Sequence, residues 1–152
     1  MRSAPLNYLI TFVLAGLLWV LTALILGGYL GNTVALTVAY VEDFVQTYRI
    51  LVSVAAVLGL LLAFWWYYYG SRPTTVGELD RAGRFWTTLF IVGLALAVGV
   101  LVALLILFRE ESFTVGQYAL FFGVFSLHTW LFFWISTLLM SPRTVQTIPW
   151  GR

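Results

Sequence analysis

The chain has 152 residues, of which 62% are hydrophobic and only 9% are charged, and its net charge is +2. Soluble domains carry about 25% charged residues, so this composition excludes a water-soluble fold. The chain contains no cysteine, which excludes disulfides, thiolate metal ligands and thiol redox chemistry.

Four apolar runs are each long enough to cross the hydrocarbon core of a bilayer, which takes about 20 helical residues. They cover residues 8–30, 50–69, 85–108 and 118–140, and none contains Asp, Glu, Lys or Arg. The connections between them are too short to form a second domain. The sequence therefore predicts an all-α polytopic membrane protein, with residues 1–152 forming one transmembrane domain of four helices in an antiparallel bundle.

The arginines predict the orientation, because short cytoplasmic loops carry the excess of basic residues. Only Arg49 and Arg109 fall on one side of the predicted bundle. The other side holds Arg2, Arg72, Arg81, Arg84, Arg143 and Arg152. We therefore expect both termini in the cytoplasm, residues 141–152 as a cytoplasmic tail, and the cell inner membrane as the location.

The connection at residues 33–48 has an amphipathic pattern, because apolar residues recur at helical spacing along it. They are Val34, Val38, Val41, Val45 and Tyr48. The segment is predicted either to lie on the outer membrane surface or to extend the second span outward. In both versions the stripe offers a contact surface for a partner, or packs on the ends of the chain's own helices.

Two helix starts can be predicted from capping boxes, in which a Thr side chain and an acid or amide three residues later satisfy each other's backbone N–H groups. Thr75 with Glu78 places the start of the third helix near Val76. Thr114 with Gln117 gives the same signal before the fourth helix.

Small residues spaced four apart occur in every span, and such stripes let helix backbones approach closely in lipid. The predicted helix-packing residues are Ala23, Gly27, Gly31, Ala55, Gly59, Ala63, Ala95, Gly99, Ala103, Ala119 and Gly123. The fourth span is instead rich in aromatic side chains, which can fill the bundle, face lipid or meet a partner protein. With the tail, it supplies the partner-contact candidates Phe121, Phe125, Trp130, Phe132, Trp134, Arg143 and Trp150.

His128 is the only histidine and lies near the middle of the fourth span. An ionisable residue at membrane depth suggests a proton relay, a metal or haem ligand, or a hydrogen bond to a quinone. A bis-His haem needs a second histidine, which the chain lacks, so no intrinsic cofactor or metal is expected, and a quinone or haem shared with another subunit stays open. The alternative is a neutral histidine bonded to a carbonyl or hydroxyl of a neighbouring helix. The hydroxyl candidates are Thr11, Thr22, Ser53, Thr87 and Thr88.

Catalysis by this chain alone is not expected, because every carboxylate lies in a connection and none can converge with His128. The sequence favours a non-catalytic accessory or scaffolding subunit of a larger inner-membrane complex, of the secretion, conjugation, respiratory or photosynthetic type. Two alternatives are a small channel formed by homo-oligomerisation and a redox-accessory subunit that uses His128. The expected partners are other integral membrane proteins and lipid, not nucleic acid or a soluble substrate.

Overall fold

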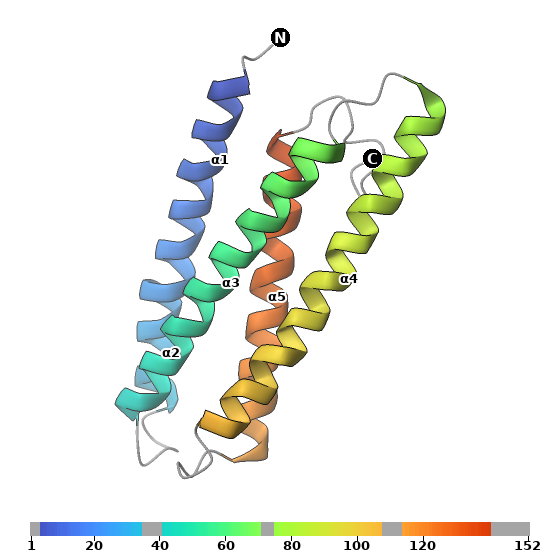
Figure 1. The fold of residues 1–152 in the computed structure, drawn as a ribbon. Coiled ribbons are helices and arrows are strands. Elements are labelled where there is room, and N and C mark those ends of the chain that lie inside the picture. Colours follow the sequence, from blue (N-terminus) through green and yellow to red (C-terminus); the bar gives the residue numbers. More distant parts are fainter. Residues whose placement is uncertain (1–3, 35–40, 71–74, 108–113, 141–152) are drawn as a thin grey trace.

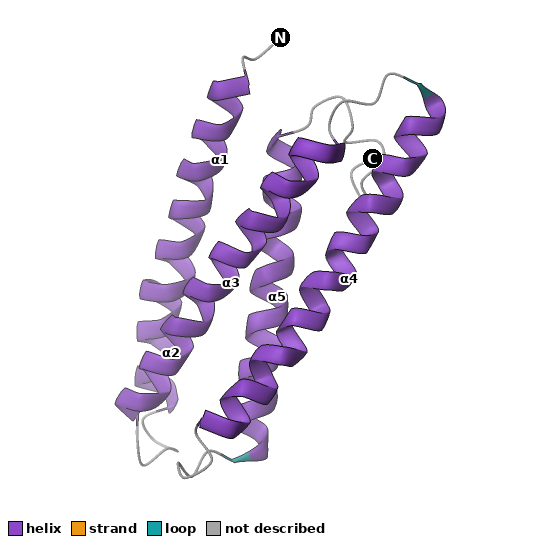
Figure 2. Cartoon of the chain, in the orientation of Figure 1, coloured by secondary structure: helices purple, strands orange, loops and turns teal. Residues whose placement is uncertain are grey.

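The computed structural model describes residues 4–34, 41–70, 75–107 and 114–140, and nearly all of them are helical (Figures 1 and 2). The first rod consists of α1 (Ala4–Trp19), a π-helical segment η1 (Val20–Leu26) and α2 (Gly27–Val34). It is followed by α3 (Val41–Gly70), α4 (Val76–Leu107) and α5 (Val115–Met140). In Figure 1 the four rods lie side by side, and the chain reverses direction from each rod to the next.

Four helices among the described residues are long and apolar enough to cross a membrane, which confirms the predicted number of spans. The candidate spans are Tyr8–Thr33, Val41–Tyr68, Val76–Val100 and Val115–Leu138. Large apolar side chains cover their outer surfaces, for example Leu17, Leu61 and Ile91. This distribution suits a chain whose outer solvent is hydrocarbon.

Both predicted helix starts are confirmed. The Glu78 backbone N–H donates to Thr75 Oγ1 over 3.3 Å, and the Thr75 N–H donates to the Glu78 carboxylate over 3.1 Å. The Thr114 N–H likewise donates to Gln117 Oε1 over 2.8 Å. The bonds are reciprocal at α4, whereas at α5 the Gln117 N–H donates to the Thr114 carbonyl O over 3.0 Å. They satisfy backbone donors at the helix starts, so α4 and α5 begin where the sequence places them.

The predicted amphipathic segment 33–48 does not form a separate element over its described part. Residues 41–48 belong to α3, so this part of the segment continues the helix of the second span. Val45 and Tyr48 turn toward the first rod, because both pack against its glycines. The side chain of Val34 and all of Val38 lie outside the described residues.

The most extensive interface between rods is that of α3 with α5. A methyl group on Gly59 would lie 2.7 Å from Phe132 Cβ and 3.0 Å from both the Phe133 backbone N and the Thr129 carbonyl O. These distances are shorter than van der Waals contact, so only glycine fits. Since lipid gives helices little hydrophobic reason to associate, this backbone contact is a main source of the packing energy.

Glycines also join the first rod to α3. A methyl group on Gly31 would lie 2.8 Å from Val45 Cγ2, and one on Gly27 would lie 3.2 Å from two ring carbons of Tyr48. Ala23 is fully buried in the same interface. The first helical hairpin is therefore held by small residues on one side and by Val45 and Tyr48 on the other.

We predict that Gly59→Ala destabilises the folded chain by about 1–3 kcal/mol, the usual effect of forcing a methyl group into a packed interface. The measurement is the free energy of unfolding in mixed detergent micelles. Gly16→Ala is the matched control, because a methyl group on Gly16 meets nothing within 4 Å. Equal stability of the two variants would contradict the close α3–α5 crossing.

Candidate functional site

The first unusual feature is the π-helical segment Val20–Leu26 in the first rod. A π-helical turn breaks the regular i→i−4 pattern of backbone hydrogen bonds, and such turns often mark functional positions. Here the Tyr48 hydroxyl of α3 donates a hydrogen bond to the Thr22 carbonyl over 3.1 Å. Tyr48 is 1% exposed, so this bond lies inside the bundle and connects the first two spans.

His128 of α5 lies next to this bond. Its ring meets that of Tyr48 edge-on, with 6.5 Å between the ring centroids. Nδ1 is 2.7 Å from the Val124 carbonyl O, and since a carbonyl can only accept, Nδ1 carries the proton and donates. The predicted bond to a neighbouring helix is therefore replaced by one within α5, because the carbonyl one turn back is the nearest acceptor.

The second ring nitrogen of His128 is buried and has no hydrogen-bond partner among the described residues. The residue as a whole is 4% exposed. An unpartnered polar atom at this depth is energetically costly, and it gives His128 one open coordination or hydrogen-bonding position. Tyr48, His128 and the Thr22 carbonyl thus bring α3, α5 and the first rod together.

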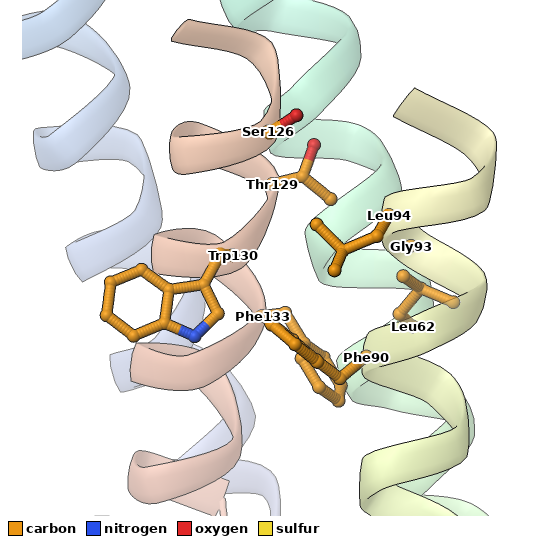
Figure 3. A pocket seen from close by; sticks show the side chains of 8 residues that line it. All are labelled: Leu62, Phe90, Gly93, Leu94, Ser126, Thr129, Trp130 and Phe133. Carbon is orange, nitrogen blue, oxygen red and sulfur yellow. The ribbon is translucent and has the colours of Figure 1, made fainter. Parts of the chain in front are cut away.

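A second polar feature lies on the same turn of α5. Ser126 Oγ and Thr129 Oγ1 are both buried without a hydrogen-bond partner in the described part of the chain. They line a cavity of about 10 Å³ between α5, α4 and α3, whose other walls include Gly93 and Leu62. Figure 3 shows both hydroxyls on α5 beside the helix that carries Gly93.

The size of this cavity limits what it can hold. Ligand pockets measure roughly 300–1,000 Å³, whereas a single water needs roughly 10–15 Å³. A cavity of about 10 Å³ is therefore at the lower limit for one water and far too small for a quinone ring or a haem. The described residues also contain no group of three or more His, Cys, Asp or Glu side chains that could hold a metal ion.

The predicted small-residue stripes fall into two groups. Those of the first and second spans lie at helix contacts inside the bundle: Ala23, Gly27, Gly31, Ala55, Gly59 and Ala63. Those of the third and fourth spans face outward instead: Ala95, Gly99, Ala103, Ala119 and Gly123. A methyl group on Gly99 or Gly123 would meet nothing within 4 Å. The α4 contacts inside the bundle use a different face, with Trp86, Gly93 and Ala97.

The predicted partner-contact residues are also divided by the structure. Four of them are at most 1% exposed and pack inside the bundle: Tyr48, Phe121, Phe125 and Phe132. This corrects their assignment to an outer surface, because these rings fill the space around the α3–α5 crossing. Val41 and Val45 are half-buried, as are Trp130 and Trp134, whose rings stack at 5.5 Å. Arg143 and Trp150 lie outside the described residues.

Several polar contacts between helices were not predicted from the sequence. Trp19 Nε1 donates to Ser53 Oγ over 2.9 Å between the first rod and α3, and Trp86 Nε1 donates to Thr137 Oγ1 over 3.1 Å between α4 and α5. Tryptophan N–H groups and hydroxyls at membrane depth are the available signal, since each needs a partner in lipid. The π-helical segment gave no recognisable sequence signal.

Comparisons of the chain with protein-family models, with curated proteins and with solved structures find no match. The class of the protein therefore rests on its own features. Four apolar helices of membrane-spanning length, with polar side chains turned inward, define a multi-pass α-helical membrane protein.

We predict that Tyr48→Phe lowers the free energy of unfolding by about 0.6–1.7 kcal/mol, the measured range for hydrogen bonds between membrane helices. The variant leaves the Thr22 carbonyl without the Tyr48 hydroxyl and changes nothing else in the interface. Tyr29→Phe is the control, since the Tyr29 side chain is 66% exposed. If both variants unfold like the parent chain, the Tyr48–Thr22 bond does not stabilise the bundle.

Proposed function

We propose that this chain is a non-catalytic subunit of a larger membrane assembly, and that it docks through the outward face of α4. In this proposal the four helices form an antiparallel bundle in the inner membrane of a bacterial-type cell, with both termini in the cytoplasm. The partner is another integral membrane protein.

The observation that carries the proposal is the exposed small-residue stripe of α4, formed by Ala95, Gly99 and Ala103. The equivalent stripes in the first rod and in α3 are covered by helices of this same chain. The stripe of α4 has the same spacing but nothing packs on it within the described bundle. Ala119 and Gly123 of α5 are exposed near the same end, beside the connection between α4 and α5.

Such a stripe favours a protein neighbour over lipid. Small residues allow two helix backbones to approach, and the resulting van der Waals contact is a principal source of helix association in a bilayer. Acyl chains gain no comparable advantage from a glycine surface. A helix of a second chain is therefore the occupant that suits this face best.

The two alternative functions receive less support from the geometry. A pore needs polar groups on a shared surface, but the exposed Thr87 and Thr88 hydroxyls are bonded to carbonyls of their own helix. A redox-accessory role needs His128 within reach of a cofactor. Its open nitrogen is buried among the chain's own helices.

We predict that Gly99→Leu reduces the fraction of the chain found in a hetero-assembly by about tenfold, because a bulky side chain in a packed helix contact costs about 1–3 kcal/mol. Native mass spectrometry after gentle detergent extraction measures this fraction. Gly16→Leu is the matched control, since Gly16 is equally open but lies on α1.

Two results would contradict the docking proposal. One is a hetero-assembly that survives Gly99→Leu unchanged. The other is a parent chain that is isolated as a self-sufficient homo-oligomer and conducts ions in liposomes, which would support the channel instead.

The proposed orientation has its own test, which the absence of native cysteine makes simple. Val76 and Val115 are the first residues of α4 and α5 and are 84% and 86% exposed. We predict that an impermeant thiol reagent labels Val115→Cys in intact cells, and labels Val76→Cys only after permeabilisation. The reverse pattern would invert the proposed topology.

A further inference from the structure

A larger hollow lies at the opposite end of the first helical hairpin from the N-terminus, between the end of the first rod and the start of α3. Its volume is about 570 Å³, within the range of small-molecule sites. It is lined by Gly28, Gly31, Asn32, Val41, Glu42, Val45, Gln46, Arg49 and Ile50. This end of the hairpin is the lower end of the first rod and α3 in Figure 1.

The polar residues of this hollow form an ordered series along one face of α3. Glu42, Gln46 and Arg49 are spaced at i, i+4 and i+7, which places them on the same side of the helix. Glu42 and Arg49 are about 10 Å apart along the axis at 1.5 Å per residue. Both are exposed, and neither forms an ion pair with another described residue. A carboxylate, an amide and a guanidinium are thus available at one site.

The first rod leaves room for a ligand beside this series. Gly28 carries no side chain, and a methyl group placed on it would meet nothing within 4 Å. The Arg49 stem runs past Gly27, since its Cγ lies 3.8 Å from the position that a methyl group on Gly27 would take. Asn32 adds a second amide on the opposite wall.

The hollow also lies at the level where polar residues give way to apolar ones. The uninterrupted apolar run of α3 begins at Ile50, directly after Arg49, and Ile50 itself lines the hollow. An arginine at the end of a span places its charged head in the interface while its stem stays near the hydrocarbon. The level of the site is therefore that of phospholipid headgroups.

We infer that this hollow binds the headgroup of a phospholipid that carries both a phosphate and a primary ammonium, as in phosphatidylethanolamine. Arg49 holds the phosphate, because its guanidinium donates paired hydrogen bonds to phosphate oxygens. Glu42 accepts from the ammonium, and Gln46 lies between the two. A purely anionic headgroup would face the Glu42 carboxylate, and a choline headgroup has no N–H to donate to it.

The test uses the full-length chain, stripped of lipid in detergent and mixed with dioleoyl phosphatidylethanolamine, phosphatidylcholine or phosphatidylglycerol. Native mass spectrometry measures the dissociation constant of each lipid adduct. We expect phosphatidylethanolamine to bind about tenfold more tightly than the other two lipids, as one additional charge-assisted hydrogen bond would provide. Arg49→Gln should weaken the binding of all three phospholipids at this site. Glu42→Gln should remove only the preference for phosphatidylethanolamine.

Arg84→Gln is the matched control, because Arg84 is an interfacial arginine of another helix and is paired with Asp80 over 2.7 Å. Circular dichroism of every variant verifies that the helices are intact, as expected for exposed side chains. Equal affinity for the three lipids, or an ethanolamine preference that survives Glu42→Gln, would overturn the inference. So would equally tight binding of soluble glycerophosphoethanolamine, since the occupant would then be a free headgroup compound. None of these outcomes depends on a protein partner, so this inference and the docking proposal can fail separately.

Discussion

The backbone contact between α3 and α5 at Gly59 is the constraint on which the rest of the fold depends. In lipid, apolar side chains gain almost nothing by leaving one neighbour for another, so helices need a surface that lets their backbones approach. Gly59 provides that surface opposite Phe132 and Thr129. Around this crossing the buried aromatic rings fill the remaining space, including Phe121, Phe125 and Phe133. The outer two rods then pack on the surfaces that the α3–α5 pair presents.

The hydrocarbon core of a bilayer contains no water, and this explains where the buried polar groups lie. A tyrosine hydroxyl or tryptophan N–H inside a bilayer can be satisfied only by the protein, and several such groups among the described residues tie two helices together. Tyr48 connects α3 to the π-helical segment, Trp19 connects the first rod to α3, and Trp86 connects α4 to α5. Buried polar atoms of Ser126, His128, Thr129 and Trp134, all on α5, have no hydrogen-bond partner among the described residues. Ser126 and Thr129 line a cavity with room for about one water.

Helix number, span positions and helix starts could be predicted from the sequence, because each depends on local properties: a long apolar run, or a Thr with Glu78 or Gln117 three residues later. The contact partners could not. Ala95 and Ala55 belong to equally spaced stripes, yet one faces outward and the other is buried, because the choice depends on how the whole helix is rotated. Aromatic rings such as Phe125 are equally stable against lipid and in a bundle interior, so composition alone could not show that Phe125 is buried. The hollow at Arg49 forms where the ends of two helices meet, so no local sequence pattern could predict it.

The most direct measurement of the central claim is a carbon–carbon correlation in the uniformly labelled chain reconstituted in bilayers, recorded by magic-angle-spinning NMR. A close contact of α3 and α5 at Gly59 predicts a cross-peak between Gly59 Cα and Phe132 Cβ at mixing times that otherwise detect only neighbouring residues. If that cross-peak is absent while contacts within α3 and within α5 are resolved, the two backbones do not meet at Gly59, and the arrangement of the bundle described above is wrong.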